Sequence, residues 1–267
     1  MLFRSQIRGF RVRLPLDICV VASANPEDYT NRGRIITPLK DRYGAQIRTH
    51  YPKQIDVEIN IMDAEHSPLL SSDGYRITVP RFMKEIIAET TSMAREHADI
   101  NQRSGVSVRM SIANYESMIS NALRRAILLR EDEVVPRISD LASIIPSSTG
   151  KIELETVEEG KEGQIIDELV KKAVKKVFNQ NFRAEDFTSF LQNFTSGRSL
   201  EVSDTMPTAI YSQKARGMGG LQDAVQRLEG LESPALLASA IEFILEGLHL
   251  NKKLNKKMLE GEISYWG

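Results

Sequence analysis

The spacing of apolar residues indicates helices over most of the chain that follows Pro52. Residues 110–130 are the clearest case, because apolar side chains recur every three or four positions and would form one stripe along a helix. Pro80 precedes residues 81–99, where proline suits the first turn of a helix. The predicted helices are residues 54–66, 81–99, 110–130, 140–145, 164–178, 234–250 and 251–259, whereas residues 197–220 are predicted to be irregular.

The segment before Pro52 has the shorter period that is typical of strands. Residues 6–13 alternate loosely around a glycine and predict a β-hairpin. Residues 16–23 are a short β-branched run that begins after a proline, which favours a buried strand containing Cys19. A polar turn, a short helix ended by Gly44 and a returning strand over residues 45–52 follow. This order of elements predicts the edge of an α/β domain.

The predicted fold class is therefore mostly α with a small α/β portion. Residues 150–163 are charged and contain glycine, which is typical of a linker. They follow the first group of helices and precede the second. The predicted divisions are an α/β part over residues 1–52, a helical part over 53–146, a linker over 147–163 and a second helical part over 164–267.

The amino-acid composition excludes several classes of protein but does not indicate a function. The chain has 267 residues, of which 41% are hydrophobic and 27% are charged, values that exclude collagen-like and wholly disordered chains. A single cysteine excludes an internal disulfide framework and a four-thiolate zinc site. No apolar run reaches the 18 or so residues that span a membrane, and the N-terminus lacks the apolar core of a secretory signal. The expected compartment is the cytoplasm.

Charge is unevenly distributed along the chain. Residues 1–50 carry nine basic and four acidic side chains, a net charge of +5, so the remainder carries −6. A basic segment of this kind favours an anionic partner, and scattered surface arginines are the alternative. Four lysines on one face of the predicted helix over residues 164–178 could also bind an anion, although a solvated helix face is the more ordinary interpretation. They are Lys171, Lys172, Lys175 and Lys176.

Several familiar catalytic motifs are missing from these 267 residues. The phosphate-binding pattern G-x-x-x-x-G-K-[ST] does not occur, and neither does the G-x-S-x-G motif of a serine nucleophile. The four histidines, at positions 50, 66, 97 and 249, do not pair at metal-ligand spacing, so surface or half-buried positions are expected for them. Cys19 is expected to be a small core residue.

Candidate functional residues occur at three places, each at the end or the start of a predicted element. Asn25 follows a predicted strand, where its amide could touch a phosphate oxygen or orient a water, although Asn-Pro is also an ordinary turn signal. The pair Asp41 and Arg42 ends the short predicted helix, where such a pair usually caps the surface but an arginine could also reach a phosphate on a partner. Arg109 opens a long predicted helix, where it could simply pack its stem on the surface.

The order of these segments and their amino-acid sequences resemble those of one protein family. Residues 6–44, QIRGFRVRLPLDICVVASANPEDYTNRGRIITPLKDRYG, resemble the second half of the AAA+ module of magnesium chelatase I-subunit-type ATPases. The likeness lies in an extra hairpin, a strand ending in Asn-Pro-Glu, and a Pro-Leu-x-Asp-Arg-aromatic element. GVSVR at 105–109 resembles the start of that family's sensor-2 helix, and VPRISDL at 135–141 resembles the end of its helical lid.

The resemblance implies a role for each candidate residue. Asn25 would be sensor 1, Arg109 would be sensor 2 on the γ-phosphate of its own subunit, and Arg42 would be the arginine finger for ATP held by the adjacent subunit. Asp41 would steady the finger or the subunit contact. Residues 1–52 would be the C-terminal part of the AAA+ α/β core, residues 53–146 the lid, and residues 164–267 a helical extension.

The resemblance also implies how such a chain would work. ATP and magnesium would be the cofactors of the complete module, and a homo-oligomeric ring would couple hydrolysis to remodelling of an unidentified protein partner. The Walker A and B half would lie upstream, so the chain would be inactive alone. One alternative is a non-enzymatic helical interaction scaffold. Another is an AAA+ relative that binds nucleic acid through the arginines of the hairpin, but these arginines lack interleaved aromatic residues other than Phe10.

Overall fold

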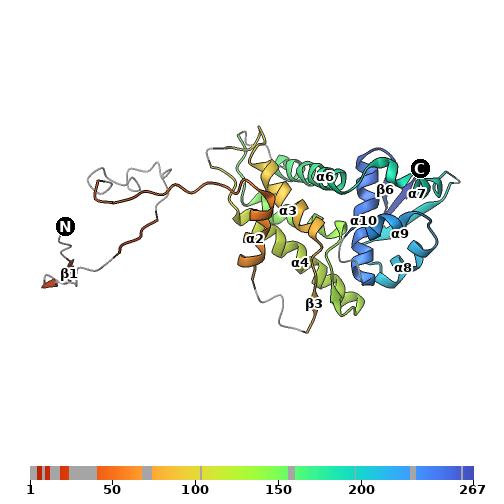
Figure 1. Cartoon of the computed structure of the whole chain (residues 1–267), viewed down its shortest axis with the longest axis horizontal. Helices are drawn as coiled ribbons and strands as arrows, with labels where there is room; N and C mark the ends of the chain where they lie inside the picture. Colours follow the sequence, from red (N-terminus) through yellow and green to blue (C-terminus); the bar gives the residue numbers. More distant parts are fainter. Residues whose placement is uncertain are drawn as a thin grey trace. The chain divides into compact units, whose positions relative to one another are not determined.

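Two compact units make up the chain in the computed structural model, Met1–His50 and Tyr51–Gly267, and each is considered by itself (Figure 1). The structure describes residues 5–7, 10–12, 19–23, 41–67, 74–102, 104–155, 160–195, 197–228, 233–259 and 261–267. Over these residues the chain is mostly helical with small sheets, as the sequence predicts.

In the first unit the predicted hairpin is present. Strands β1 (Ser5–Ile7) and β2 (Phe10–Val12) are antiparallel, with Gln6 opposite Arg11. The buried strand predicted over residues 16–23 is wrong for its described part. Residues 19–23 form no strand, and Val21 and the supposed core residue Cys19 are both exposed. A β-branched run becomes buried only when neighbouring strands cover it, and the described part of this unit provides only the two short hairpin strands.

The segment that leads out of the first unit also differs from the prediction. Asp41 and Arg42 lie in a turn instead of a helix, and residues 45–52 form no strand. Ile47, which would face the interior of a sheet, is 91% exposed. The physical reason is the same, because a strand needs a partner for its backbone hydrogen bonds.

The first helices of the second unit match the predicted ones in place and number. They are α2 (Ile55–Glu65), α3 (Arg81–Ala94) and α4 (Arg109–Leu129). Helix α3 ends about a turn earlier than predicted, and a 3₁₀ turn, η2 (Ile138–Ser143), replaces most of the short helix predicted over residues 140–145 before α5 (Ile144–Thr149) begins. A short parallel pair of strands, β3 (Arg76–Ile77) and β4 (Glu133–Val134), joins the start of α3 to the end of α4.

The remaining elements are helices around a three-stranded sheet. Helix α6 (Lys161–Asn181) is followed by η3 (Ala184–Phe187), α7 (Thr188–Gln192), α8 (Thr208–Arg216), α9 (Leu221–Gln226) and α10 (Pro234–Leu250). The antiparallel sheet has the order β5-β7-β6, formed by β5 (Ser199–Ser203), β6 (Asn255–Leu259) and β7 (Glu262–Trp266).

Two predictions for this region are wrong. Residues 197–220 are not irregular, because they contain β5 and α8. Residues 251–259 are not a helix, because α10 ends at Leu250, Lys252 adopts a left-handed φ of 60°, and the chain returns as β6. A short run of nine residues carries too few periods to separate a strand from a helix, and pairing with β7 decides it here.

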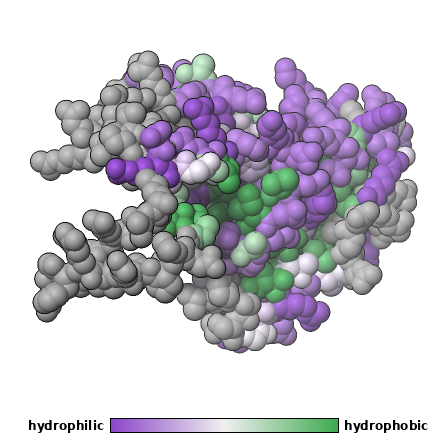
Figure 2. Space-filling view, turned by 60° about the vertical axis from the view of Figure 1, so that its left-hand side comes forward, coloured by the Kyte–Doolittle hydropathy of each residue, from purple (hydrophilic) through white to green (hydrophobic). Residues whose placement is uncertain are grey.

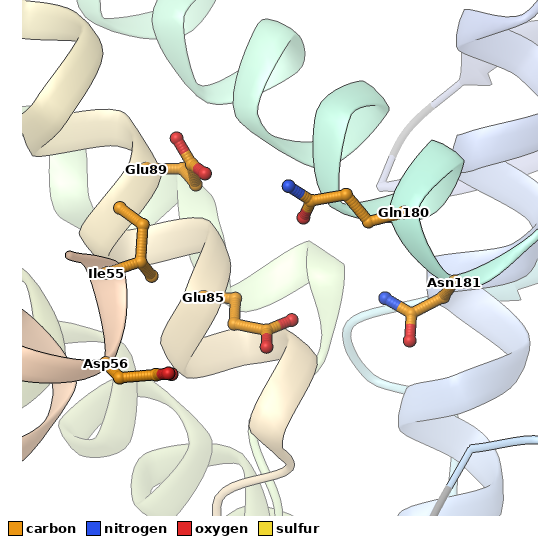
Figure 3. Close-up of a pocket in the computed structure, with 6 residues that line it drawn as sticks. All are labelled: Ile55, Asp56, Glu85, Glu89, Gln180 and Asn181. Atoms are coloured by element: carbon orange, nitrogen blue, oxygen red, sulfur yellow. The ribbon is translucent and has the colours of Figure 1, made fainter.

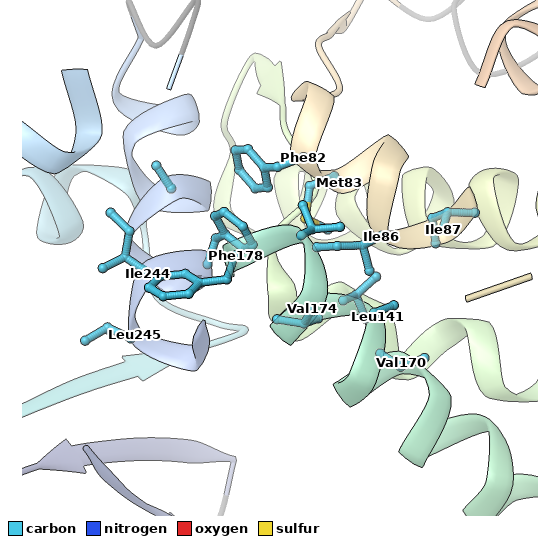
Figure 4. Packing of buried hydrophobic residues seen from close by; sticks show 14 of the residues in the cluster. Phe82, Met83, Ile86, Ile87, Leu141, Val170, Val174, Phe178, Ile244 and Leu245 are labelled. Carbon is cyan, nitrogen blue, oxygen red and sulfur yellow. The ribbon is translucent and has the colours of Figure 1, made fainter. Parts of the chain in front are cut away.

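Helices α3, α6 and α10 share one hydrophobic core (Figure 4). Phe82 of α3 stacks on Phe243 of α10, with ring centroids 4.5 Å apart, and Phe178 of α6 meets the same ring edge-on at 5.9 Å. The segments expected as a separate lid and extension are therefore packed together within Tyr51–Gly267. The four lysines of α6 lie on its exposed face, as expected for a solvated helix.

Polar side chains cover much of the surface that Figure 2 presents, with apolar side chains visible between them. Within the described residues, none of the helices has both the length and the apolar character needed to cross a bilayer.

Gly247 offers a test of this shared core. A Cβ at this position would lie 2.0 Å from Cδ2 of Phe178, so the ring rests directly on the backbone of α10. We expect Gly247→Ala to lower the free energy of unfolding by about 1–3 kcal/mol through overpacking, although alanine is the better helix former. Chemical denaturation measures the change.

Gly163→Ala is the matched control. Its Cβ would meet nothing nearer than Cγ2 of Ile145 at 3.6 Å, which is an ordinary contact. We expect this variant to raise the free energy of unfolding, by no more than about 1 kcal/mol. Equal effects of the two variants would contradict the packing of Phe178 on α10.

Candidate functional site

Arg109 stands at the first position of α4, as the sequence predicts. The chain reaches it through Gly105, whose φ of 69° is in the left-handed region. The side chain is exposed, and both its backbone N–H and its Nε donate to Oγ of Ser107, at 3.2 and 3.3 Å. Its guanidinium forms no ion pair with any residue that the structure describes. A free cation at the positive end of a long helix favours an anionic ligand.

A buried ion pair lies directly beneath this turn. Nη1 and Nη2 of Arg95 donate to the two carboxylate oxygens of Glu58 at 2.6 and 2.7 Å, in a bidentate arrangement. Nε of Arg95 donates to the carbonyl oxygen of Val106 at 3.0 Å, and the Ser111 hydroxyl donates to Glu58. The pair therefore holds the chain on both sides of Arg109.

The other predicted site residues belong to the first unit. Arg42 and Asp41 are exposed in a turn, and neither forms an ion pair with the described residues. Asn25 lies outside the described residues, so its place is a prediction only. Arg42 and Arg109 thus lie in different units.

A second candidate site is an acidic pocket of about 370 Å³ between α2, α3 and α6 (Figure 3). Its lining consists of Ile55, Asp56, Glu85, Glu89, Gln180 and Asn181. The amides of Gln180 and Asn181 point from α6 toward the carboxylates of α3 in Figure 3. Glu89, which is 3% exposed, pairs with Lys176 at 2.7 Å. The carboxylates of this pocket suit a cationic ligand more than an anionic one.

Burial raises the pKa of the Glu85 carboxyl, while the hydrogen bond and charge of Arg81 oppose that shift. Arg81 bridges Asp56 and Glu85 with distances of 2.6 and 2.8 Å. The sequence analysis missed this pocket. Glu85 and Glu89 are one helical turn apart, but such spacing is also that of an ordinary solvated face.

Two buried glutamates on α10 are structural anchors. Glu242 accepts hydrogen bonds from the Tyr211 hydroxyl at 2.5 Å and from the backbone N–H of Ser139 at 2.9 Å. Glu246 accepts from the Tyr265 hydroxyl and from Lys256, both at 2.6 Å. Burial first, and the neighbouring carboxylate next, raise the pKa of both tyrosine hydroxyls, so these stay protonated donors. The glutamates hold α8 and the sheet against α10.

The VPRISDL segment is also structural. Asp140 is fully buried and accepts from Asn121 at 2.8 Å and from Nη2 of Arg125 and the backbone N–H of Arg137 at 2.7 Å each. The guanidinium of Arg137 lies over the ring of Tyr211 at 4.7 Å and donates to the carbonyl oxygen of Met206 at 2.8 Å. This segment therefore ties α4 to the chain that precedes α8.

No cluster of three or more potential metal ligands occurs among the described residues. The histidines are exposed or half-buried, as predicted. No family model, curated protein or solved structure matches the chain.

Glu85 gives a pH-dependent prediction. The folded chain retains the Glu85 proton to a higher pH than the unfolded chain does, so its ionisation costs stability as pH rises above the ordinary value of 4.5. Glu85→Gln removes that cost. We expect the Tm of this variant, relative to the parent chain, to be higher at pH 7 than at pH 4, measured by thermal denaturation.

Loss of the ion pair with exposed Arg81 should change little. Glu65→Gln, which removes an exposed carboxylate at the end of α2, controls for the loss of one charge. A relative Tm for Glu85→Gln that falls between pH 4 and pH 7 would show that Glu85 is not desolvated.

Proposed function

We propose that this chain is the C-terminal portion of an AAA+ ATPase of the magnesium chelatase I-subunit type. The complete module would couple ATP hydrolysis in a homo-oligomeric ring to the remodelling of a protein partner. The observation that carries the proposal is Arg109, an exposed arginine at the first position of a 21-residue helix, which forms no ion pair with the described residues.

The surroundings of Arg109 fit a phosphate. Its charge adds to the positive end of α4, and the buried Glu58–Arg95 pair fixes the turn before it. Arg109 would bind the γ-phosphate of ATP in its own subunit. ATP with magnesium supplies the phosphoryl group to be transferred, and the loop that cradles its other phosphates is not among these 267 residues.

Arg42 would act on the neighbouring subunit. It is exposed in a turn with no ion pair to the described residues, so its planar guanidinium is available to a phosphate that another subunit presents. A finger supplied in this way makes hydrolysis depend on assembly of the ring.

Exposed apolar side chains in the first unit support the proposal that another half of the AAA+ module packs against it. Val20, Val21 and Ile47 are 57%, 90% and 91% exposed. A β-branched run such as residues 19–23 suits a strand inside a sheet that is covered on both faces. A Walker-bearing α/β half would supply the neighbouring strands.

The test is an ATPase assay of the chain assembled with the Walker-bearing half that the proposal requires, to be sought in the sequence encoded upstream. We expect Arg42→Ala to lower the rate by about 10³-fold or more, because a finger arginine stabilises the charge of the transition state. Arg109→Ala should also lower it. The matched controls are Arg48→Ala, an exposed arginine of the same unit, and Arg124→Ala, an exposed arginine of the same helix.

A mixing experiment checks the action between subunits. Rings that contain both Arg42→Ala subunits and subunits lacking the Walker A lysine should recover part of the activity lost by each, because one subunit then supplies the finger and the other binds ATP. A rate for Arg42→Ala equal to that of Arg48→Ala would remove the finger. An assembly without any ATPase activity would favour the helical interaction scaffold.

A further inference from the structure

Tyr51 lies at the boundary between the two units of the chain. It is the first residue of the second unit and directly follows the segment that carries Arg42. The guanidinium carbon of Arg95 lies 4.6 Å from the centre of its ring, which is a cation–π contact. The chain that leaves the first unit is therefore fastened at once to the end of α3.

The hydroxyl of Tyr51 reaches the turn before Arg109. A Cβ on residue 105 would lie 2.3 Å from this oxygen, so the tyrosine side chain would have to shift, and Gly105 also has a φ of 69°. The backbone conformation therefore favours glycine at this position, and a Cβ there would also displace the Tyr51 hydroxyl.

Arg95 connects the two contacts. The same guanidinium that covers Tyr51 donates to the carbonyl oxygen of Val106, which is fully buried, and binds Glu58 through both of its terminal nitrogens. The side chains of Arg95 and Glu58 are only 9% and 2% exposed. A buried bidentate pair of this kind is rigid, and breaking it leaves an uncompensated charge.

These contacts form a continuous path from residue 51 to residue 109. Tyr51 packs on Arg95 and Gly105, Arg95 holds Val106, and the hydroxyl of Ser107 accepts both hydrogen bonds from Arg109. Every step lies within the second unit.

We propose that Tyr51 is a positioning residue that holds the turn bearing Arg109. This inference rests on the proposed function for what Arg109 does, whereas the contact itself is a property of the fold. With the turn held, the guanidinium of Arg109 would keep one place at the start of α4, where it would meet the γ-phosphate.

The first experiment needs no nucleotide. Gly105→Ala should lower the Tm of the chain, and Tyr51→Phe should restore part of the loss when both are present, because the oxygen at 2.3 Å is gone and the next ring atom is 3.6 Å away. Tyr51→Phe alone keeps the ring over Arg95 and should change the Tm little. An equal Tm for Gly105→Ala with and without Tyr51→Phe would overturn the contact.

Hydrogen exchange tests whether the contact holds the turn. Tyr51→Ala should speed exchange of the backbone N–H groups of residues 105–111 at least several-fold, while those of α10 keep the parent rate. Arg48→Ala, three residues earlier, is the control and should leave both regions unchanged. Unchanged exchange in residues 105–111 of Tyr51→Ala would contradict the positioning role.

The ATPase assembly then separates the positioning role from the proposed function. We expect Tyr51→Ala to lower kcat, and the double variant with Arg109→Ala to be no slower than Arg109→Ala alone, because both changes act through one residue. Multiplicative effects would overturn the positioning role although the ATPase stands. Absence of ATPase activity with altered exchange in Tyr51→Ala would instead reject the proposed function and keep only the structural contact.

Discussion

The ring of Phe178 against the backbone of Gly247 is the contact on which the second unit depends. It allows α6 to approach α10 closely enough for Phe178 to meet Phe243, on which Phe82 of α3 also stacks, so that α3, α6 and α10 enclose one core. Because interiors are close-packed, a helix that lies at this distance fixes its neighbours as well. The helices that flank residues 150–155 consequently pack together, and α4 contributes Met110 and Met118 to the same core.

Charged groups divide into two populations around this core. Arg95, Arg125 and Arg137 are buried against Glu58, Asp140 and the ring of Tyr211, and they hold helices and turns together. Arg42 and Arg109 are exposed and have no ion pair within the described residues. A buried arginine must be paired, since its desolvation is otherwise too costly, whereas an exposed one keeps its charge available to a ligand. Burial therefore separates the arginines that build the fold from those that the proposed ATPase would use.

Prediction from the sequence succeeds where a pattern is long. The stripes in residues 110–130 and 164–178 give α4 and α6, and the loose alternation around Gly9 gives the hairpin. Prediction fails in short segments whose secondary structure or burial depends on contact with another segment of the chain. Residues 251–259 become β6 because β7 pairs with them, and residues 19–23 stay exposed because no described strand covers them. The acidic pocket could not be foreseen, because Glu85 and Gln180 are brought together only by the packing of α3 on α6.

The sequence by itself determined the helical character of the chain, the start of a long helix at Arg109 and the absence of a phosphate-binding loop from these residues. These are local properties, set by side-chain periodicity and by the glycine before the helix. Only the tertiary structure decided that Arg95 pairs with Glu58, that Tyr51 lies against Gly105, and that the two helical segments share a core. Those contacts join residues far apart in the chain, and their free energy arises from burial and desolvation, which no single segment contains.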